Sequence, residues 1–294
     1  LTNHDMDRVF NKLGYSNEKM KLAASIYLTL PGVPFIYYGE EIGMIGTGDH
    51  QNIRRPMQWS NSVNAGFSNS VPWRSVANNY LTNNLETTLS DTNSLVNHYK
   101  KLIQIRKKYA ALRKGNILML ENNSEEILSF ARTFRNKIVL INCNLSNNLA
   151  YPFLSLLKSS LPEGNYYLLD LFNNNELGTI LINSQGGFEN LNLFSNGLSP
   201  MESSIVLISP DSNSHASREN NVIIGTEAGA DADMVDGANV VYIGYRAGYE
   251  TTGYGAIHIG ANAGQYADGN GNVSVGQNSM MGHASYGGTP LYNV

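Results

Sequence analysis

Several features are scarce in this sequence of 294 residues, and each scarcity excludes a class of protein. Cys143 is the only cysteine, so no disulfide can form within the chain, and the redox compartment stays open. No apolar run approaches the ~20 residues of a membrane span. Basic runs are absent and the net charge is −4, which argues against a nucleic-acid partner. No cofactor is evident from any motif.

Lysine is missing altogether from residues 211–294, and this marks a break in composition. Only Arg218 and Arg246 oppose eight acidic residues there, and the segment holds 15 of the 28 glycines. Residues 1–210 hold 18 basic and 16 acidic residues, a net charge of +2. The stretch "SPDSNSHASRENN" between the two parts is polar and predicts a linker. Two unrelated architectures therefore follow one another along the chain.

The first part alternates between helical and extended patterns. Residues 16–30 predict a helix with Ser16 or Asn17 as its N-cap, and it stops before Pro31. The run "GVPFIYYG" at 32–39 predicts a short buried strand. A long loop containing "IRRPMQWS" comes next, and residues 91–109 predict a second helix with lysines near its C-terminal end. From about residue 113 to residue 210, short apolar runs between turn residues predict an antiparallel β domain.

This order of elements fits the last two βα units of a (β/α)8 barrel, a fold that places catalytic residues at the C-terminal ends of its strands. On this interpretation "NHD", at residues 3–5, ends strand seven, and the loop from Glu40 to about Tyr80 follows strand eight. The predicted fold is therefore multi-domain. It comprises a truncated barrel end at 1–112, an antiparallel β-sandwich at 113–210, a linker at 211–220 and a glycine-rich repeat at 221–294.

Three motifs in the first part carry a resemblance to a known family. "LTNHDMDR", "LPGVPFIYYGEEIGM" and "IRRPMQW" resemble the alpha-amylase family of glycoside hydrolases, nearest to its bacterial alpha-amylases and oligo-alpha-glucosidases. The likeness covers about residues 1–210. It implies a retaining hydrolase that acts on alpha-1,4 or alpha-1,6 bonds of an alpha-glucan or maltooligosaccharide.

The resemblance also implies roles for single residues. Asp5 matches the aspartate that stabilises the oxocarbenium-like transition state, His4 matches a histidine that binds sugar hydroxyls, and Asn3 supports both. Arg8 either binds sugar or pairs with a barrel carboxylate. Arg54, with its neighbours Arg55, Gln58 and Trp59, lies in the loop over the site, where either sugar stacking or packing fits.

Some groups are expected to lie outside the chemistry. Glu40 and Glu41 are adjacent at a strand end, so their side chains should point apart, which favours a structural role. His50 and Trp73 stay unassigned. The family's nucleophile and acid/base belong to strands four and five, which we expect upstream of Leu1. The chain alone should therefore be inactive, and strand eight and the inner face of the helices should be exposed.

The second part repeats the pattern apolar-x-apolar-Gly-x-x-small-small. Its first glycines are Gly225, Gly244, Gly260 and Gly276, which lie 19, 16 and 16 residues apart. The apolar pairs of each copy are expected to face a common core. These pairs are Val222/Ile224, Val241/Ile243, Ile257/Ile259 and Val273/Val275. The pattern resembles heads of trimeric autotransporter adhesins and phage tail fibres, which implies a β-roll or β-solenoid and a homotrimer.

The repeat supports an alternative function, a cell-surface or phage-fibre structural or adhesive protein with an amylase-derived passenger. The join between the two parts would then make the chain a chimera. "DADMVDG" at 231–237 lacks the ligand spacing of a calcium loop, so no metal site is predicted there. Localisation stays open, with an extracellular or cell-surface setting favoured.

Overall fold

The structure is a computed structural model that describes residues 2–210, 222–229, 240–251, 255–267 and 271–281. The chain divides into two compact units, Leu1–Ile208 and Ser209–Val294, which are considered separately below. The calcium-loop question at 231–237 lies outside the described residues.

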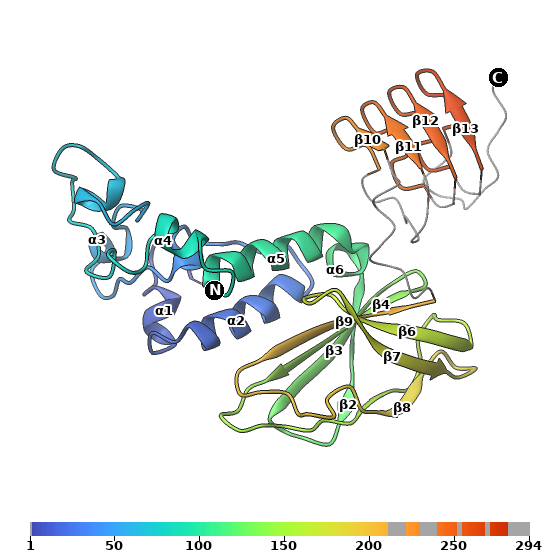
Figure 1. Cartoon of the computed structure of the whole chain (residues 1–294), viewed down its shortest axis with the longest axis horizontal. Helices are drawn as coiled ribbons and strands as arrows, with labels where there is room; N and C mark the ends of the chain where they lie inside the picture. The colour runs from blue at the N-terminus through green and yellow to red at the C-terminus, as the bar shows by residue number, and fades with distance from the viewer. Residues whose placement is uncertain (1, 211–221, 230–239, 252–254, 268–270, 282–294) are drawn as a thin grey trace. The chain divides into compact units, whose positions relative to one another are not determined.

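The N-terminal part of the first unit is organised around two long helices, α2 and α5. Helix α2 spans Asn17–Thr29, and the Ser16 side chain caps it by accepting from the backbone N–H of Lys19, as its sequence predicts. Helix α5 spans Leu95–Lys108, with Ser94 as N-cap and three basic residues in its last turn. The two helices lie side by side in Figure 1. Short helices α1 (Val9–Lys12) and α6 (Ala110–Lys114) flank them.

The expected strand over "GVPFIYYG" does not form, so this prediction is wrong. No strand occurs between residues 2 and 115, and residues 3–5 form a turn and not a strand end. A parallel strand needs at least one hydrogen-bonded neighbouring strand and cover on its faces, and residues 32–39 have no strand beside them, while Pro34 also lacks a donor. Val33 and Phe35 are each 79% exposed, which agrees with the expectation that this segment would be uncovered.

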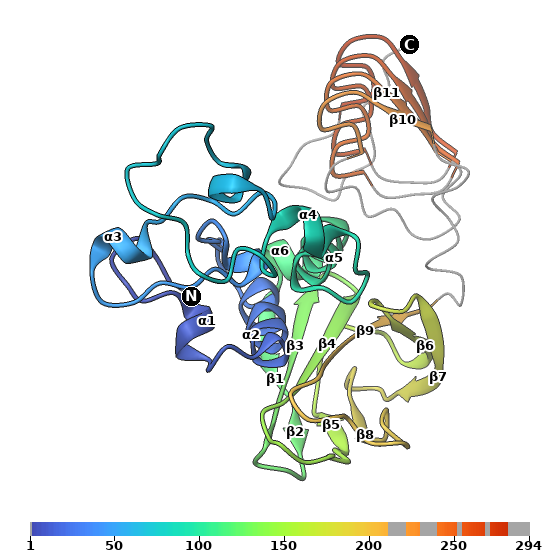
Figure 2. The ribbon, with the colours of Figure 1, turned by 60° about the vertical axis from the view of Figure 1, so that its left-hand side comes forward.

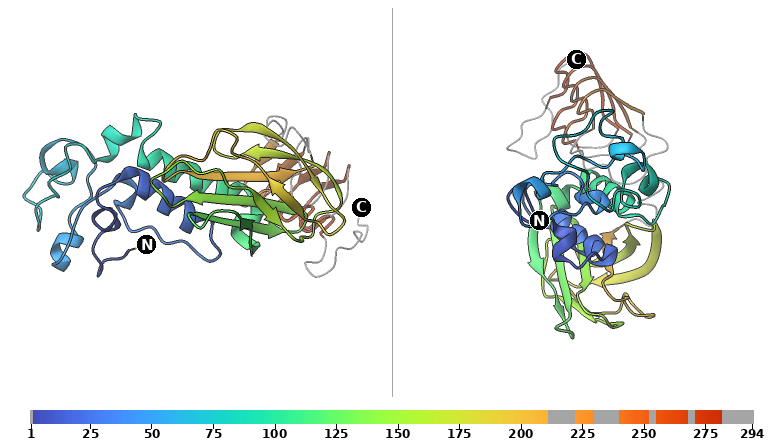
Figure 3. Two further views of the ribbon diagram at one scale, coloured as in Figure 1. Left: turned by 90° about the horizontal axis from the view of Figure 1, so that it is seen from below. Right: turned by 90° about the vertical axis from the view of Figure 1, so that its left-hand side faces the viewer.

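The segment between the two long helices extends away from them, as the blue and cyan ribbon of Figure 3 shows. It contains η1 (Glu40–Ile42), α3 (His50–Ile53), η2 (Val63–Gly66) and α4 (Leu85–Leu89). A small core of Ile42, Met44, Met57 and Val96 attaches this segment to α5. The connection matters because α3 supplies part of the candidate site.

Nine strands follow, arranged in two sheets. The larger sheet has the order β1-β3-β4-β9-β6-β7, the smaller one β2-β5-β8, and the pairs β1–β3, β3–β4, β4–β9 and β6–β7 are antiparallel, as predicted. The strands are β1 Asn116–Met119, β2 Glu121–Asn122, β3 Ile127–Phe134, β4 Lys137–Asn144, β5 Leu154–Leu156, β6 Gly164–Asp170, β7 Asn175–Ile182, β8 Phe188–Leu191 and β9 Ser203–Ser209.

Both faces of the larger sheet are covered. Helices α2 and α5 lie beside the strands β3 and β4 in Figure 2. Val139 and Ile141 of β4 belong to the core that includes these helices, whereas Ile138 and Leu140 belong to the core that includes the smaller sheet. Because side chains alternate along a strand, one apolar strand serves both cores. Arg132 of β3 is fully buried and donates to the backbone carbonyls at the ends of α2 and α6, so it ties the helices to the sheet.

Among its described residues, the second unit has four parallel strands paired in register. They are β10 Val222–Ile224, β11 Val241–Ile243, β12 Ile257–Ile259 and β13 Val273–Val275. Gly244 follows β11 with a φ of 127°, and a Cβ there would lie 2.7 Å from the backbone of Gly260. Glycine is therefore required at this position both by backbone conformation and by the close approach of the next copy.

The expected assignment of the inner face of this sheet is wrong. The middle residues Tyr242, His258 and Ser274 are buried, at 1–4% exposure, whereas Val222 and Ile224 are 43% and 58% exposed and Val275 is 68% exposed. Alternation along a strand determines which residues share a face but not which face turns inward. The buried cluster in this unit contains Tyr242 of β11 together with Val240, Ala247 and Ala256.

Candidate active site

The "NHD" tripeptide forms a turn that orients Asp5. The Asn3 side-chain oxygen accepts a hydrogen bond from the backbone N–H of Asp5 at 2.8 Å. This bond back to the chain is the usual reason that asparagine occurs in turns. His4 Nε2 lies 3.1 Å from Asp5 Oδ2, so one carboxylate oxygen faces the neighbouring imidazole. Asn3, His4 and Asp5 therefore form one local unit, as expected.

Helix α3 brings two more groups to the second oxygen of Asp5. Arg54 Nη2 donates to Asp5 Oδ1 at 2.7 Å, and His50 Nδ1 lies 3.3 Å from the same oxygen. Arg54 also donates through Nε to the carbonyl of His4 at 3.0 Å. Arg54 is thus where the sequence placed it, over the tripeptide. His50 was missed, although its spacing of four residues from Arg54 puts both on one helical face.

The cluster is open to solvent. The side chains of Asp5 and Arg54 are 52% and 43% exposed, and those of His4 and His50 are 63% and 58% exposed. An ion pair this exposed contributes about 0–1 kcal/mol to stability. The contacts therefore serve mainly to orient the Asp5 carboxylate, and they leave it accessible to a molecule from solution.

Arg8 does not face this opening, which removes it from the substrate-binding residues. Its side chain is 2% exposed and donates to the backbone carbonyls of Ile53 at 2.9 Å and Tyr38 at 2.7 Å. The guanidinium also lies 4.7 Å from the ring centroids of Tyr37 and Tyr38. Burial lowers the pKa of Arg8, and the two nearby tyrosines oppose that shift. Arg8 joins the tripeptide segment to α3 and to residues 37–38, and it thereby positions the site.

An aromatic cavity of about 510 Å³ lies beside Arg54. Tyr38, Trp59, Phe67 and Trp73 line it, and each is between 39% and 63% exposed. Sequence reasoning left open whether Trp59 packs or faces a ligand, and it gave Trp73 no role. Gln58 is buried, and its side-chain amide donates to the carbonyl of Asn83, so it holds the loop and does not face the cavity.

The two adjacent glutamates point apart, as predicted. Glu40 is 3% exposed and accepts hydrogen bonds from the hydroxyls of Tyr99 at 2.7 Å and Tyr27 at 3.1 Å, so it is a structural group between α2 and α5. Glu41 instead lines the aromatic cavity, and burial raises its pKa.

Two kinds of site are missing from the described part of the chain. No group of three or more His, Cys, Asp or Glu side chains there is placed to hold a metal ion. Within the same residues, no helix has the length and apolar character needed to cross a bilayer.

Comparison with known proteins points to one family. The sequence profile "Alpha amylase, catalytic domain" matches residues 1–115. Alpha-amylase 3 of Dictyoglomus thermophilum is 40% identical over 148 residues, which cover 50% of this chain and 29% of that protein. Oligo-1,6-glucosidase of Halalkalibacterium halodurans is 31% identical over 182 residues, covering 48% of this chain and 32% of that protein.

Solved structures agree with the sequence matches. The alpha-amylase of H. orenii superposes with a TM-score of 0.51 at 29% identity, covering 71% of this chain and 39% of its own. An isomaltulose synthase mutant of Erwinia rhapontici superposes with a TM-score of 0.53 at 25% identity over 71% of this chain and 42% of its own. The chain spans about a third or less of the length of the curated relatives above. Residues 1–115, which carry the Asp5 site, are therefore similar in sequence to the catalytic domain of the alpha-amylase family of glycoside hydrolases.

Proposed function

We propose that residues 1–115 supply the C-terminal part of the active site of a retaining glycoside hydrolase that acts on alpha-glucans. Asp5 stabilises the transition state, and Asn3, His4 and Arg54 orient it or bind sugar. The observation that carries the proposal is the Asp5 carboxylate, held by Arg54 at 2.7 Å and by two histidines, yet half exposed.

The geometry suits the charge that such a reaction develops. Cleavage of a glycosidic bond passes through an oxocarbenium-like state with positive charge at the anomeric carbon. A carboxylate that is already oriented stabilises this charge without reorganising during the reaction. Asp5 meets that requirement because its neighbours fix both of its oxygens. A neutral His4 imidazole can in addition donate a hydrogen bond to a sugar hydroxyl.

The aromatic cavity beside Arg54 supports a sugar as the ligand. Sugar rings have apolar C–H faces, which pack well on exposed indole and phenyl rings, and polar edges, which bind arginine. Trp59 and Trp73 supply the rings, and Arg54 supplies donors between the cavity and Asp5. The curated relatives named above are an alpha-amylase and an oligo-1,6-glucosidase.

The reaction needs two further carboxylates, a nucleophile and an acid/base, about 5–5.5 Å apart. We propose that both belong to other strands of the barrel. A chimera tests the assignment: the upstream barrel segment of the Dictyoglomus relative is fused to residues 1–210 and assayed on maltooligosaccharides. Asp5→Asn should lower kcat by roughly 10²–10³ because it removes the charge and keeps the shape.

Asp7→Asn is the matched control for this experiment. Asp7 lies two residues away and accepts from the backbone N–H of Gly48 and from Lys12, outside the Asp5 cluster. We expect its kcat to stay within a few-fold of the unmutated chimera. A chimera whose Asp5→Asn variant keeps its kcat would show that Asp5 has another role.

For the second unit we propose association into a homotrimer, in line with a structural or adhesive role at a cell or fibre surface. The specific observation is the outward face of the four parallel strands, which carries eight β-branched apolar residues. The residues of this face on the two edge strands are well exposed, with Ile224 of β10 at 58% and Val273 of β13 at 60%. Apolar patches of this kind on soluble proteins usually mark an interaction surface.

Light scattering of the full chain tests this association directly. A mass of three chains is expected, and Ile243→Glu combined with Ile259→Glu should reduce it to one chain. Tyr245→Glu is a suitable control, because Tyr245 is 47% exposed but follows the strand and does not belong to the apolar face. A monomeric unmutated chain would refute the trimer.

A further inference from the structure

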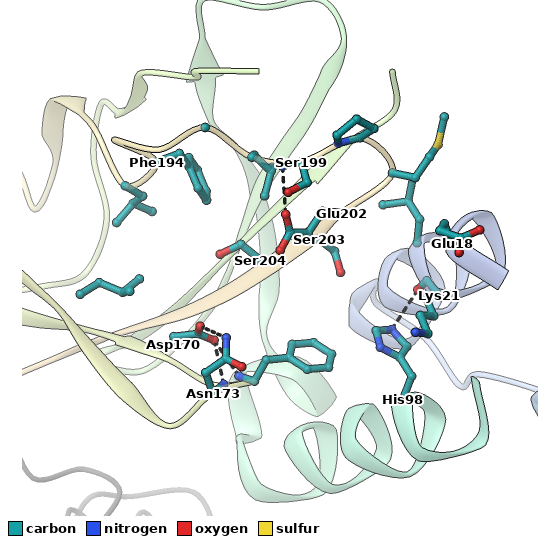
Figure 4. Close-up of a pocket in the computed structure, with 18 residues that line it drawn as sticks. Glu18, Lys21, His98, Asp170, Asn173, Phe194, Ser199, Glu202, Ser203 and Ser204 are labelled. Atoms are coloured by element: carbon teal, nitrogen blue, oxygen red, sulfur yellow. Dashed lines mark hydrogen bonds between the residues drawn. The ribbon is translucent and has the colours of Figure 1, made fainter. Parts of the chain in front are cut away.

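A second cavity of about 510 Å³ lies within the first unit, on the side of α2 and α5 that faces the β domain. Figure 4 shows the residues around it: Glu18 and Lys21 on α2, His98 on α5, Asp170 at the end of β6, Asn173 after β6, and the segment from Phe194 to Ser204 before and at the start of β9. Its lining shares no residue with the aromatic cavity or the Asp5 cluster. A volume of this size is typical of small-ligand sites.

The imidazole ring of His98 lines this cavity in a fixed position and without charge. Its ring stacks on Phe172 with centroids 5.0 Å apart, and Nε2 lies 3.1 Å from the carbonyl of Lys21. A carbonyl only accepts, so Nε2 carries the proton and Nδ1 is left as an acceptor. Burial lowers the pKa of His98 to about 4, so the ring is uncharged at neutral pH. Ser25 and Ser203 complete this hydrogen-bonded group, which joins α2 to β9.

The polar groups of the cavity are mostly hydrogen-bond acceptors. Three carboxylates, those of Glu18, Asp170 and Glu202, face a single cation, Lys21, whose ammonium already donates to the carbonyl of Asn93. Asp170 accepts from the backbone N–H groups of Phe172 and Asn173, which holds this carboxylate in place. An anionic ligand would therefore meet net repulsion, whereas a ligand rich in hydroxyl donors would find partners.

The lining also has apolar residues. They include Leu22, Leu177, Leu193, Phe194 and Met201. A ligand that fits must therefore combine many hydroxyl donors, an apolar face and no negative charge. A pyranose ring has all three properties. We propose that this cavity is a second binding site for a neutral alpha-glucoside, separate from the Asp5 site; the choice of alpha-glucoside rests on the proposed function.

A single NMR titration of the full chain with maltose distinguishes the two sites. Trp59 and Trp73 are the only tryptophans, so their indole N–H signals report the aromatic cavity next to Asp5. The ring signals of His98 and the side-chain amide of Asn173 report the second cavity. We expect the His98 and Asn173 signals to shift as maltose is added, and the shifts to saturate at millimolar maltose. Glucose 6-phosphate, the anionic probe, should bind at least tenfold more weakly.

Two variants localise the binding. Asn173→Ala removes a polar wall residue, and Ser204→Phe fills the cavity from β9, so each should weaken the His98 response to maltose at least tenfold. The matched controls are Asn175→Ala and Thr179→Phe, which lie on β7 outside the cavity lining. They should leave the His98 response to maltose unchanged. Spectra of the free variants show whether each is folded.

The outcomes separate this inference from the proposed function. Shifts of the indole signals alone would overturn the second site and leave the Asp5 site intact. Equal binding of glucose 6-phosphate would overturn the argument from charge. A His98 response that persists in both variants would place the ligand elsewhere. If neither set of signals moves with maltose, the second site is refuted, and sugar binding by the first loses its support as well.

Discussion

Replacing Arg8 with methionine should open the candidate site without unfolding the rest of the first unit. Arg8 is the residue through which the "NHD" turn, residues 37–38 and α3 are joined. Methionine has a similar length and fills the same apolar space, but it cannot donate to the carbonyls of Ile53 and Tyr38. The substitution therefore removes the polar contacts and largely keeps the packing.

The magnitude follows from those contacts. A hydrogen bond from a charged donor contributes about 1.5–3 kcal/mol, and Arg8 makes two of them. The stacking on Tyr37 and Tyr38 adds about 0.5–2 kcal/mol. The unpartnered Nη2 of Arg8 offsets part of this, because burying a donor without a partner has a cost. We expect a net loss of about 3 kcal/mol, which is enough to open a peripheral segment but not two packed cores.

Hydrogen exchange measures this loss segment by segment. Amides of α3 and of residues 44–48 should lose about two orders of magnitude in protection, whereas amides of β3 and β4 should keep theirs. Lys12→Met, which removes an exposed ion pair with Asp7 in the same segment, is the control and should change little. Unchanged exchange at α3 in the Arg8→Met variant would refute the positioning role.

Three further predictions concern activity, pH and the repeat. The 294-residue chain should not hydrolyse maltooligosaccharides or a chromogenic alpha-glucoside, and turnover lost in Asp5→Ala would contradict this. Burial lowers the pKa of His258 to about 4 from 6.5, so the unfolded state binds the extra proton between these values. The free energy of unfolding of the repeat should therefore be highest above pH 6.5 and should decline by up to roughly 3 kcal/mol as the pH falls toward 4. Thermal unfolding followed by circular dichroism should show this dependence on pH. The His258→Gln variant should show a weaker dependence. Gly260→Ala places a Cβ 2.6 Å from the backbone of Gly276 at a φ of 126°, so it should lower the melting temperature of the repeat more than Gly271→Ala, where nothing lies within 4 Å.

The sequence by itself determined the local elements of this protein. Ser16 caps the helix that its position predicts, because capping depends on a few neighbouring residues. The antiparallel strands between residues 116 and 209 follow from short apolar runs between turns, and the four repeat strands follow from their period. The motifs also singled out "NHD" and Arg54, although "NHD" forms a turn and not the predicted strand end. Their spatial meeting, however, was inferred only through the family resemblance.

Tertiary structure decided what depends on neighbours distant in sequence. The run at 32–39 has strand composition, yet it forms no strand, because a parallel strand needs partners and cover. Arg8 has the polarity of a ligand-binding residue, and only its burial between Tyr37, Tyr38 and Ile53 shows that it holds the site together. In the repeat, alternation separates two sets of side chains but treats the two faces alike, and only the tertiary structure shows that Tyr242 and His258 are buried whereas β-branched residues such as Val275 are exposed.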